Sequence, residues 1–235
     1  MNTSISKNHC LVASIGTVDY REAWDLQNTL HTQVMHSIIP NVLLLLEHPH
    51  VYTLGRRASH SDILASPNEL AKLDITVHEA DRGGEVTYHG PGQLIAYPIV
   101  DMRAWGGGPL KYLRALEQVV IGTLEEFGIK ANSVNRPTGV WVSESKIAAI
   151  GVKVSRGVTT HGLALNVCPD LSYFDHIVPC GIPNASVTSM MAQDSNLQNV
   201  GTVAHTMARR FGNVFGWSLS WTNLKDLNRK TQIPV

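Results

Sequence analysis

The sequence predicts an α+β protein in which a mixed or mainly antiparallel sheet is flanked by helices, and it predicts a single domain over residues 1–235. The chain has 235 residues, of which 43% are hydrophobic, and this is enough to bury a sizeable core. Helix-like and strand-like stretches are mixed along the chain without the regular alternation of a parallel α/β fold. No long linker divides the chain, so we expect one domain.

The first 80 residues are expected to form helices and short strands. Apolar residues at helical spacing predict a helix over 21–38. The nearly all-apolar run 42–47 predicts a strand that is buried on both faces, and 51–54 predicts a further extended segment. A serine followed by a proline at the first helical position predicts a short helix over 67–73.

The rest of the chain begins with a glycine-rich loop and continues with strands and helices. Residues 82–93 contain four glycines and a proline, so we expect a loop with a brief strand inside it. The clearest helix covers 110–127, where apolar residues recur at steps of three and four, and 105–109 forms a flexible break before it. Strands are predicted at 94–100, 139–142, 147–154 and 158–167, and helices at 186–192 and 200–215.

The charge balance excludes a protein built around the attraction of phosphates. Lys and Arg number 19, Asp and Glu number 19, and the formal net charge is zero. Because there is no basic excess to release counterions, we expect no nucleic-acid partner. The longest uninterrupted apolar run covers only 42–46, whereas a membrane-spanning helix needs about 20 residues, so we expect a soluble protein without a membrane partner.

The cysteines and histidines favour a cytoplasmic protein without a metal site. Three cysteines, Cys10, Cys168 and Cys180, are an odd number at wide spacing, which is typical of a reducing cytosol. No apolar secretory segment is visible near residue 1. The 11 histidines are scattered and no pair of cysteines forms a C-x-x-C motif, so no set of metal ligands stands out.

Three places carry residues suited to chemistry, and the residues alone leave the role of each open. The loop 82–93 fits a ligand-cradling loop and a structural turn equally well, because glycine serves both. Cys180 lies on a loop between prolines, which raises the case for a reactive thiol, although most single cysteines are small core residues. Lys146 stands at the entry of the strand 147–154, where a lysine is usually a solvated charge.

Several blocks of the sequence resemble the octanoyl transferases of lipoate biosynthesis. The segment RGGEVTYHGPGQLIAYPI (82–99) is similar to the signature segment of that family. Three further blocks agree in order and spacing, at 136–142, 146–167 and 174–190, and 45–55 is similar to an upstream block. Several independent blocks in the right order make the resemblance specific, whereas a single glycine-rich loop would not.

The resemblance implies a fold, a reaction and a set of partners. The fold is that of the biotin/lipoate protein ligase catalytic domains, a mixed sheet flanked by helices. The reaction moves an octanoyl group from octanoyl-acyl carrier protein to a lysine ε-amine, through a cysteine thioester and without a cofactor. The acceptors are the lipoyl domains of 2-oxoacid dehydrogenases and the glycine cleavage H protein. Cys180 is the implied nucleophile, and Lys146 is its implied activating partner.

The resemblance also implies the substrate-binding residues. They come from the glycine-rich loop and from the two strands that follow Lys146. The implied set is Arg82, Gly83, Gly84, Glu85, Val86, Thr87, Tyr88, His89, Ala149, Ile150, Gly151, Gly162, Leu163 and Ala164.

The implied chemistry suits these residue types. A thiolate attacks a thioester readily, the acyl-enzyme is itself a thioester, and amide formation is downhill, so no ATP is needed. A cysteine thiol has a reference pKa of about 8.5, and a neighbouring ammonium favours its thiolate. The octanoyl chain needs an apolar slot, since each buried CH₂ contributes about 0.8 kcal/mol. Arg56, Arg57 and Arg82 are candidates for a basic patch at the entrance, facing an acidic carrier protein.

Three other functions fit parts of the pattern. An ATP-dependent lipoate or biotin ligase of the same fold would not need Cys180. A non-catalytic partner would only dock on lipoyl domains or on carrier protein. A papain-like hydrolase would need a base and an orienting residue around the thiol, and His176 lies only four residues upstream. The sequence also leaves open whether His89 or His161 moves protons or only shapes the pocket.

Overall fold

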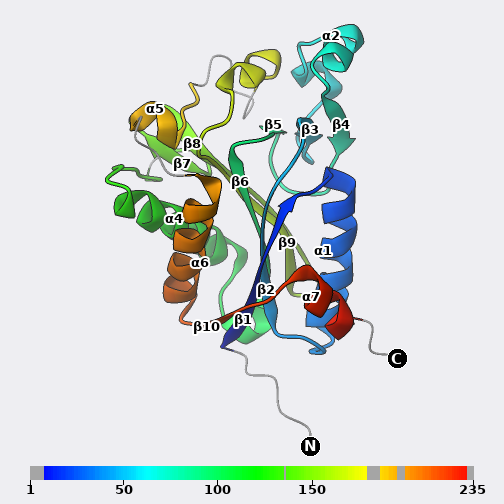
Figure 1. Cartoon of the computed structure of the whole chain (residues 1–235), viewed down its shortest axis with the longest axis vertical. Helices are drawn as coiled ribbons and strands as arrows, with labels where there is room; N and C mark the ends of the chain where they lie inside the picture. The colour runs from blue at the N-terminus through cyan, green and yellow to red at the C-terminus, as the bar shows by residue number, and fades with distance from the viewer. Residues whose placement is uncertain (1–7, 135, 179–185, 195–198, 232–235) are drawn as a thin grey trace, which may run out of the picture.

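The structure is a computed structural model that describes residues 8–134, 136–178, 186–194 and 199–231. Within these residues the strands form a seven-stranded main sheet, in the order β10-β1-β2-β6-β9-β8-β7, and a three-stranded small sheet, in the order β4-β3-β5. Helices cover both faces of the main sheet (Figure 1). The mixed sheet with flanking helices that the sequence predicts is therefore confirmed.

The elements follow one another in mixed order along the chain. The strands are β1 (His9–Thr17), β2 (Asn41–Glu47), β3 (Val51–Leu54), β4 (Thr76–Glu79), β5 (Val86–His89), β6 (Gln93–Ile99), β7 (Val140–Val142), β8 (Ser145–Ser155), β9 (Val158–Asn166) and β10 (Ser218–Trp221). The helices are α1 (Tyr20–Met35), α2 (Pro67–Lys72), α3 (Met102–Trp105), α4 (Pro109–Glu126), α5 (Met190–Gln193), α6 (Val200–Phe215) and α7 (Leu224–Thr231), with short 3₁₀ helices η1 (His60–Asp62) and η2 (Leu171–His176).

The main sheet combines parallel and antiparallel pairing. β1 pairs in parallel with both β2 and β10, and the neighbouring pairs from β2 through β6, β9 and β8 to β7 are antiparallel. The central strands β2, β6 and β9 are almost entirely buried. Because both faces of β2 are covered, the run 42–47 shows no alternation of polar and apolar residues.

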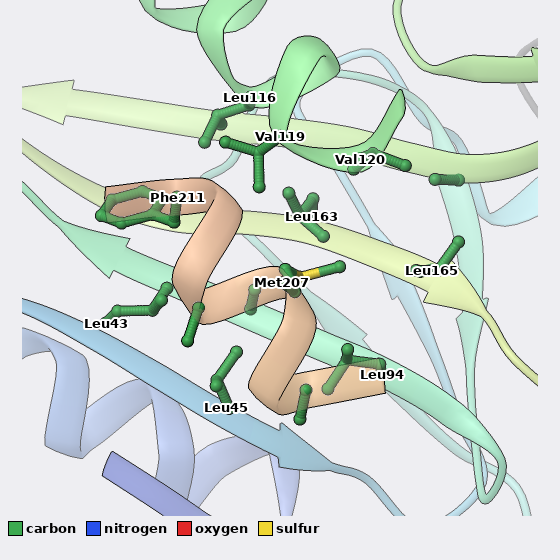
Figure 2. Packing of buried hydrophobic residues seen from close by; sticks show 14 of the residues in the cluster. Leu43, Leu45, Leu94, Leu116, Val119, Val120, Leu163, Leu165, Met207 and Phe211 are labelled. Carbon is green, nitrogen blue, oxygen red and sulfur yellow. The ribbon is translucent and has the colours of Figure 1, made fainter. Parts of the chain in front are cut away.

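Helices α4 and α6 cover one face of the main sheet and hold most of its core. Figure 2 shows Met207 and Phe211 of α6, together with Val119 of α4, lying over the strand residues Leu45 and Leu163. The buried residues of α6 recur at steps of three and four, so one stripe of the helix faces the sheet. The side chains of α4 and α6 therefore form a hydrophobic core on this face of the main sheet.

Helices α1 and α7 cover the opposite face. Leu30 and Val34 of α1 and Leu227 of α7 belong to one cluster with the buried side chains of β2 and β6. The carboxylate of Asp19 accepts a hydrogen bond from the N–H of Arg21 and so caps the first turn of α1. This cap fixes where α1 begins, next to the end of β1 (Figure 1).

The small sheet lies beyond one end of the main sheet, beside α2 (Figure 1). Tyr52 of β3 and Tyr88 of β5 pack with Phe174 of η2 and with Ile177 in a separate apolar cluster. The connection from β4 to β5 carries the start of the glycine-rich segment 82–93. The first residues of the glycine-rich segment therefore connect two strands of the small sheet.

The structure differs from the predicted elements in several places. The helix expected over 186–192 is wrong at its start: α5 begins only at Met190, because the chain before it runs extended and forms a parallel bridge between Val187 and Lys146. The break expected at 105–109 is shorter, since α3 ends and α4 begins within it. The sequence does not predict β4, β10 or α7. The two strands are four residues long and contain no buried residue, so they carry little hydrophobic pattern.

Among the described residues, no helix is both long and apolar enough to cross a membrane. Even α4, with 18 residues, carries the exposed charges of Lys111 and Arg114. In the same part of the chain, no group of three or more His, Cys, Asp or Glu side chains is placed to hold a metal ion.

Candidate active site

A cavity of about 310 Å³, which we call the central cavity, lies between the glycine-rich loop and strands β8 and β9. Its volume is in the range of small-molecule sites. Lys146 lines it, and so does every implied substrate-binding residue except Tyr88. Eight further residues that the sequence does not assign to substrate binding also line it: Tyr20, Arg57, Tyr97, Leu113, Pro137, Thr138, Val152 and His161.

The glycine-rich loop meets β8 and the end of β3 backbone to backbone. A Cβ atom on Gly151 would lie 2.8 Å from the carbonyl oxygen of Gly83, and one on Gly55 would lie 2.4 Å from that of Gly84. The N–H of Gly83 donates to the carbonyl of Val152 at 3.0 Å. Glycine is required at 55 and 151 because any side chain there would push the loop away from the strands.

Arg82 is an internal residue of the loop, which corrects its expected place in a basic surface patch. Its side chain is buried, and Nη2 donates to the carbonyl and to the hydroxyl of Thr53, at 2.6 and 2.7 Å. Its Nη1 donates to the carbonyl of Glu85 at 2.9 Å. Arg57 is exposed and lines the cavity, and its guanidinium pairs with the carboxylate of Glu85, so the two opposite charges offset each other at the cavity wall.

Lys146 is buried, with an exposed fraction of 8%, whereas the strand-entry position alone favoured a solvated charge. Its Nζ donates to the carbonyl of Thr138 at 3.2 Å and lies 5.0 Å from the ring centroid of Trp141. Its backbone N–H donates to the carbonyl of Ser186 at 2.8 Å. Backbone pairing and these contacts hold the amine in the cavity wall.

Histidines form a second part of the wall. His89 is buried, its Nδ1 lies 2.7 Å from Oε1 of Gln93, and burial holds its pKa well below the usual range. The Nε2 of His161 lies 2.8 Å from a carboxylate oxygen of Asp81, and burial lowers the pKa of this histidine as well. Both rings are therefore neutral near pH 7.

Tyrosines complete this side of the cavity. The ring of Tyr20 lies parallel to that of His89, with centroids 6.3 Å apart, and burial raises the pKa of Tyr20 to about 12. Among the described residues the hydroxyl of Tyr20 has no hydrogen-bond partner. The hydroxyl of Tyr97 lies 2.8 Å from Nε2 of His48. The tyrosine and histidine rings of this part of the wall are thus neutral near pH 7.

Tyr88 does not line the central cavity, so its assignment to the substrate site is not supported by the geometry. Successive side chains of a strand point to opposite faces, and Tyr88 faces away from Thr87 and His89 in β5. Its hydroxyl lies 2.8 Å from Nδ1 of His50, and its ring packs at 5.1 Å from that of Tyr173. Tyr88 belongs to the core of the small sheet.

Some lining residues carried a sequence signal and others did not. Tyr97, Pro137 and Thr138 lie inside blocks that resemble the octanoyl transferases, so those blocks pointed to them without assigning a role. Tyr20 of α1 and Leu113 of α4 lie outside every such block. Only the packing of the helices against the sheet brings these two side chains to the cavity.

Cys180, the implied nucleophile, lies outside the described residues. The described chain on either side is held by backbone hydrogen bonds. Before it, the N–H of Val178 donates to the carbonyl of Asp62 at 2.8 Å. After it, Ser186 accepts from Lys146, and the N–H of Thr188 donates back to the carbonyl of Lys146 at 2.9 Å. Lys146 is therefore attached to the segment that follows Cys180 in the chain.

The fold and the cavity define a catalytic domain of the lipoate-ligase type. Residues 19–212 match the family model described as the lipoyl protein ligase A/B catalytic domain. A solved bipartite lipoate protein ligase from Thermoplasma acidophilum superposes with a TM-score of 0.72, covering 97% of this chain and 91% of that one. At 14% identity this likeness shows the fold alone.

Sequence relatives are much more similar. The octanoyltransferase of Solibacter usitatus is 46% identical over 213 residues, which cover 90% of this chain and 95% of the relative. The mitochondrial octanoyltransferase LIP2 of Arabidopsis thaliana is 44% identical over 195 residues, 83% of each chain. The chain belongs to the lipoyl protein ligase A/B catalytic domain family, and within it to the octanoyltransferases.

Proposed function

We propose that this acyltransferase moves an octanoyl group from octanoyl-acyl carrier protein to a lysine ε-amine of lipoyl domains, through a thioester on Cys180. The observation that carries the proposal is the central cavity, which combines a buried lysine amine with an apolar and glycine-lined wall. Identity of 44–46% to octanoyltransferases over most of the chain supports the same reaction.

The proposed reaction has two acyl transfers. The thiolate of Cys180 attacks the carbonyl carbon of the donor, a C–S bond forms, and the carrier thiolate leaves and takes up a proton. The neutral ε-amine of the acceptor lysine then attacks the enzyme thioester. The C–N bond forms, the Cys180 thiolate leaves, and the amine nitrogen loses a proton. Thioester exchange is nearly balanced and amide formation is downhill, so no nucleotide is consumed.

Lys146 is the proposed activating residue. An ammonium close to a thiol favours the thiolate, and the same group can exchange a proton with the incoming amine. Ser186, whose carbonyl accepts from the Lys146 N–H, lies six positions after Cys180. A stretch of six residues spans up to about 20 Å, so chain connectivity permits the thiol to reach the amine.

The acyl chain is proposed to lie in the central cavity. Its wall carries the apolar side chains of Leu113, Ile150 and Leu163, and the small residues Ala149 and Ala164 leave room beside them. Burial of seven methylene and methyl groups at about 0.8 kcal/mol each would supply several kcal/mol of binding. These residues are the proposed substrate contacts, together with the implied loop residues other than Tyr88.

Partners and location belong to the same proposal. The proposed donor is octanoyl-acyl carrier protein, and the proposed acceptors are the lipoyl domains of 2-oxoacid dehydrogenases and the glycine cleavage H protein. A single catalytic domain over 1–235 fits the family match to 19–212. The wide spacing of the three cysteines supports a cytoplasmic location.

The test uses intact-protein mass spectrometry and a transfer assay from octanoyl-acyl carrier protein to a lipoyl domain. Wild-type protein is expected to gain one octanoyl group, mapped to Cys180. Cys180→Ala should abolish this adduct and lower turnover by at least about 1,000-fold, and Lys146→Met should lower turnover about 100-fold. Cys168→Ala is the matched control, because Cys168 is a partly buried cysteine whose pKa is raised by burial.

Two results would contradict the proposal. Near-wild-type turnover of Cys180→Ala would exclude the acyl-enzyme. Transfer that requires ATP and free octanoate, with release of pyrophosphate, would establish a ligase instead. If the pH dependence of the thiol alkylation rate is the same in Lys146→Met as in wild type, Lys146 is not the activating residue. This result would not affect the assignment of Cys180 as the nucleophile.

A further inference from the structure

The central cavity lies at a seam between the two sheets. The segment 81–85, which links β4 to β5, belongs to the small sheet and is held there by backbone bonds from Arg56 to Arg82 and from Arg57 to Gly84, at 3.0 and 3.1 Å. On the other side it reaches the main sheet through the Gly83 to Val152 bond and through the side chain of Asp81. The position of this segment relative to β8 and β9 sets the width of the cavity.

Asp81 contacts both strands of the β8–β9 hairpin. One carboxylate oxygen lies 2.5 Å from Nζ of Lys153 on β8, and the other lies 2.8 Å from Nε2 of His161 on β9. The side chains of Asp81 and Lys153 are 35% and 28% exposed, whereas that of His161 is only 2% exposed. Hydrogen bonding from His161, followed by the contact with Lys153, keeps the pKa of Asp81 well below its usual range.

His161 is held in a strained position that makes it a fixed attachment point. Its φ is +58°, a left-handed conformation that side chains rarely adopt, and among the described residues it is the one non-glycine with positive φ inside a strand. Its N–H donates to Oε1 of Gln27 on α1 at 2.7 Å, and its ring packs against Trp24 at 5.6 Å. Strain of this kind persists only where surrounding contacts determine it, so His161 cannot follow a moving loop.

We propose that Asp81 is a positioning residue for acyl transfer: through His161 and Lys153 it holds the segment 81–85 against the β8–β9 hairpin and thereby sets the acyl-chain selectivity of the central cavity. The role in acyl-chain selectivity rests on the function proposed above. The attachment of segment 81–85 to the β8–β9 hairpin through Asp81 does not. Gly83 and Gly151 meet backbone to backbone at this point, so a shift of the segment directly widens the cavity.

The attachment is tested by amide hydrogen exchange, which does not depend on activity. The amide of Gly83, bonded to Val152, is expected to exchange at least about tenfold faster in Asp81→Ala than in wild type. Lys153→Met, which leaves the His161 contact intact, should give an intermediate rate. Asp101→Ala is the matched control, because Asp101 forms its ion pair with Arg103 away from the cavity. Unchanged exchange of the Gly83 amide in both Asp81→Ala and Lys153→Met would overturn the attachment.

Selectivity is tested with carrier-protein thioesters of 6, 8, 10 and 12 carbons. Asp81→Ala is expected to raise KM for the eight-carbon donor several-fold with a smaller change in kcat, and to reduce the preference for eight over twelve carbons at least about fivefold. If Asp81→Ala does not fold, Lys153→Met should show a smaller rise in KM and a smaller loss of the preference for eight carbons. A wild-type chain-length profile in folded variants would overturn the inference, while absence of octanoyl transfer by wild type would instead reject the proposed function.

Discussion

Tyr20 places a phenol ring in the wall of the central cavity, and its hydroxyl has no hydrogen-bond partner among the described residues. A buried hydroxyl without a partner loses its interactions with water and gains nothing in return. Tyr52 is the opposite case, because its hydroxyl donates to the carbonyl of Tyr173 at 2.6 Å. Removal of the hydroxyl group is therefore expected to affect stability in opposite directions at the two positions.

Tyr20→Phe is expected to raise the free energy of unfolding by about 1 kcal/mol, since it removes an unsatisfied polar atom and keeps the ring. Tyr52→Phe is expected to lower it by about 1–2 kcal/mol, because the carbonyl of Tyr173 loses its donor. Urea unfolding of both variants measures the difference. Equal losses of stability in the two variants would show that the Tyr20 hydroxyl has a partner that matters.

Single residues show where sequence reasoning succeeds and where it stops. The block resemblance pointed to Lys146 although its position alone favoured a solvated charge, and the structure shows it buried against Trp141. The same resemblance placed Tyr88 at the substrate site, where the alternation of β5 turns it away. A contiguous motif does not distinguish the two faces of a strand, so a run of adjacent residues includes members of both.

At the level of elements, β6 and β9 approach one another closely beside the cavity. A Cβ atom on Gly162 of β9 would lie 2.1 Å from the carbonyl oxygen of Ala96 on β6. It would also lie 2.6 Å from Cδ of Pro98. Because these neighbours belong to the backbone and to a rigid ring, they have little freedom to move aside. The close pairing of β6 with β9 therefore depends on a glycine at 162.

Gly162→Ala is expected to lower the free energy of unfolding by about 3 kcal/mol, because the added methyl group overlaps the adjacent strand. Gly122→Ala in the interior of α4 is the contrasting variant. Its added atom would meet Arg210 at an ordinary 3.4 Å, and alanine favours the helix by about 0.5–1 kcal/mol. Urea midpoints of the two variants give the comparison; a loss below about 1 kcal/mol in Gly162→Ala would contradict the close approach.

Elements with a strong hydrophobic pattern were predictable from the sequence. The helices corresponding to α1, α4 and α6 and the strands corresponding to β2, β6, β8 and β9 agree with the predicted ranges within a few residues. The helix expected over 186–192 was displaced by pairing of the chain with Lys146, a tertiary contact that no local pattern encodes. β4 and β10 were not predicted because a strand of four residues with none buried carries too little hydrophobic pattern.

At the level of the whole molecule, buried histidines link folding to pH. His48 lies between the carbonyl of Val18 and the hydroxyl of Tyr97, at 2.6 and 2.8 Å. Burial lowers its pKa to about 4. Burial also lowers the pKa of His89. The folded state therefore keeps these rings neutral at pH values where the unfolded chain takes up protons.

Stability should fall as the pH drops from about 6.5 towards 4. Above pH 6.5 both states of His48 are neutral, and below it only the unfolded state binds the proton, so unfolding is favoured progressively. His48 alone is expected to lower the free energy of unfolding by about 2 kcal/mol between pH 7 and pH 5. Urea unfolding at pH 7, 6 and 5 measures this, and His48→Gln should flatten the profile. A wild-type free energy that stays constant over this range would contradict the buried neutral ring.

The architecture was predictable as a class but not as a topology. Mixed helices and strands predicted a mixed sheet with flanking helices, and the family blocks specified the fold. The order of the strands, and the meeting of α1 with β8 and β9 around the cavity, depend on contacts between distant parts of the chain. Sequence periodicity reports which side of an element is buried and says nothing about the partner against which it is buried.

The pairing of β1 with β10 has a consequence for synthesis of the protein. Residues 9–12 pair in parallel with 218–221. The outer edge of β1 therefore stays unpaired until roughly 200 further residues have been synthesised. At bacterial and eukaryotic translation speeds this wait lasts roughly 10–40 s. An unpaired strand edge is a template for other chains, so nascent copies on neighbouring ribosomes compete with β10 for the same backbone groups until the ribosome releases the last strand.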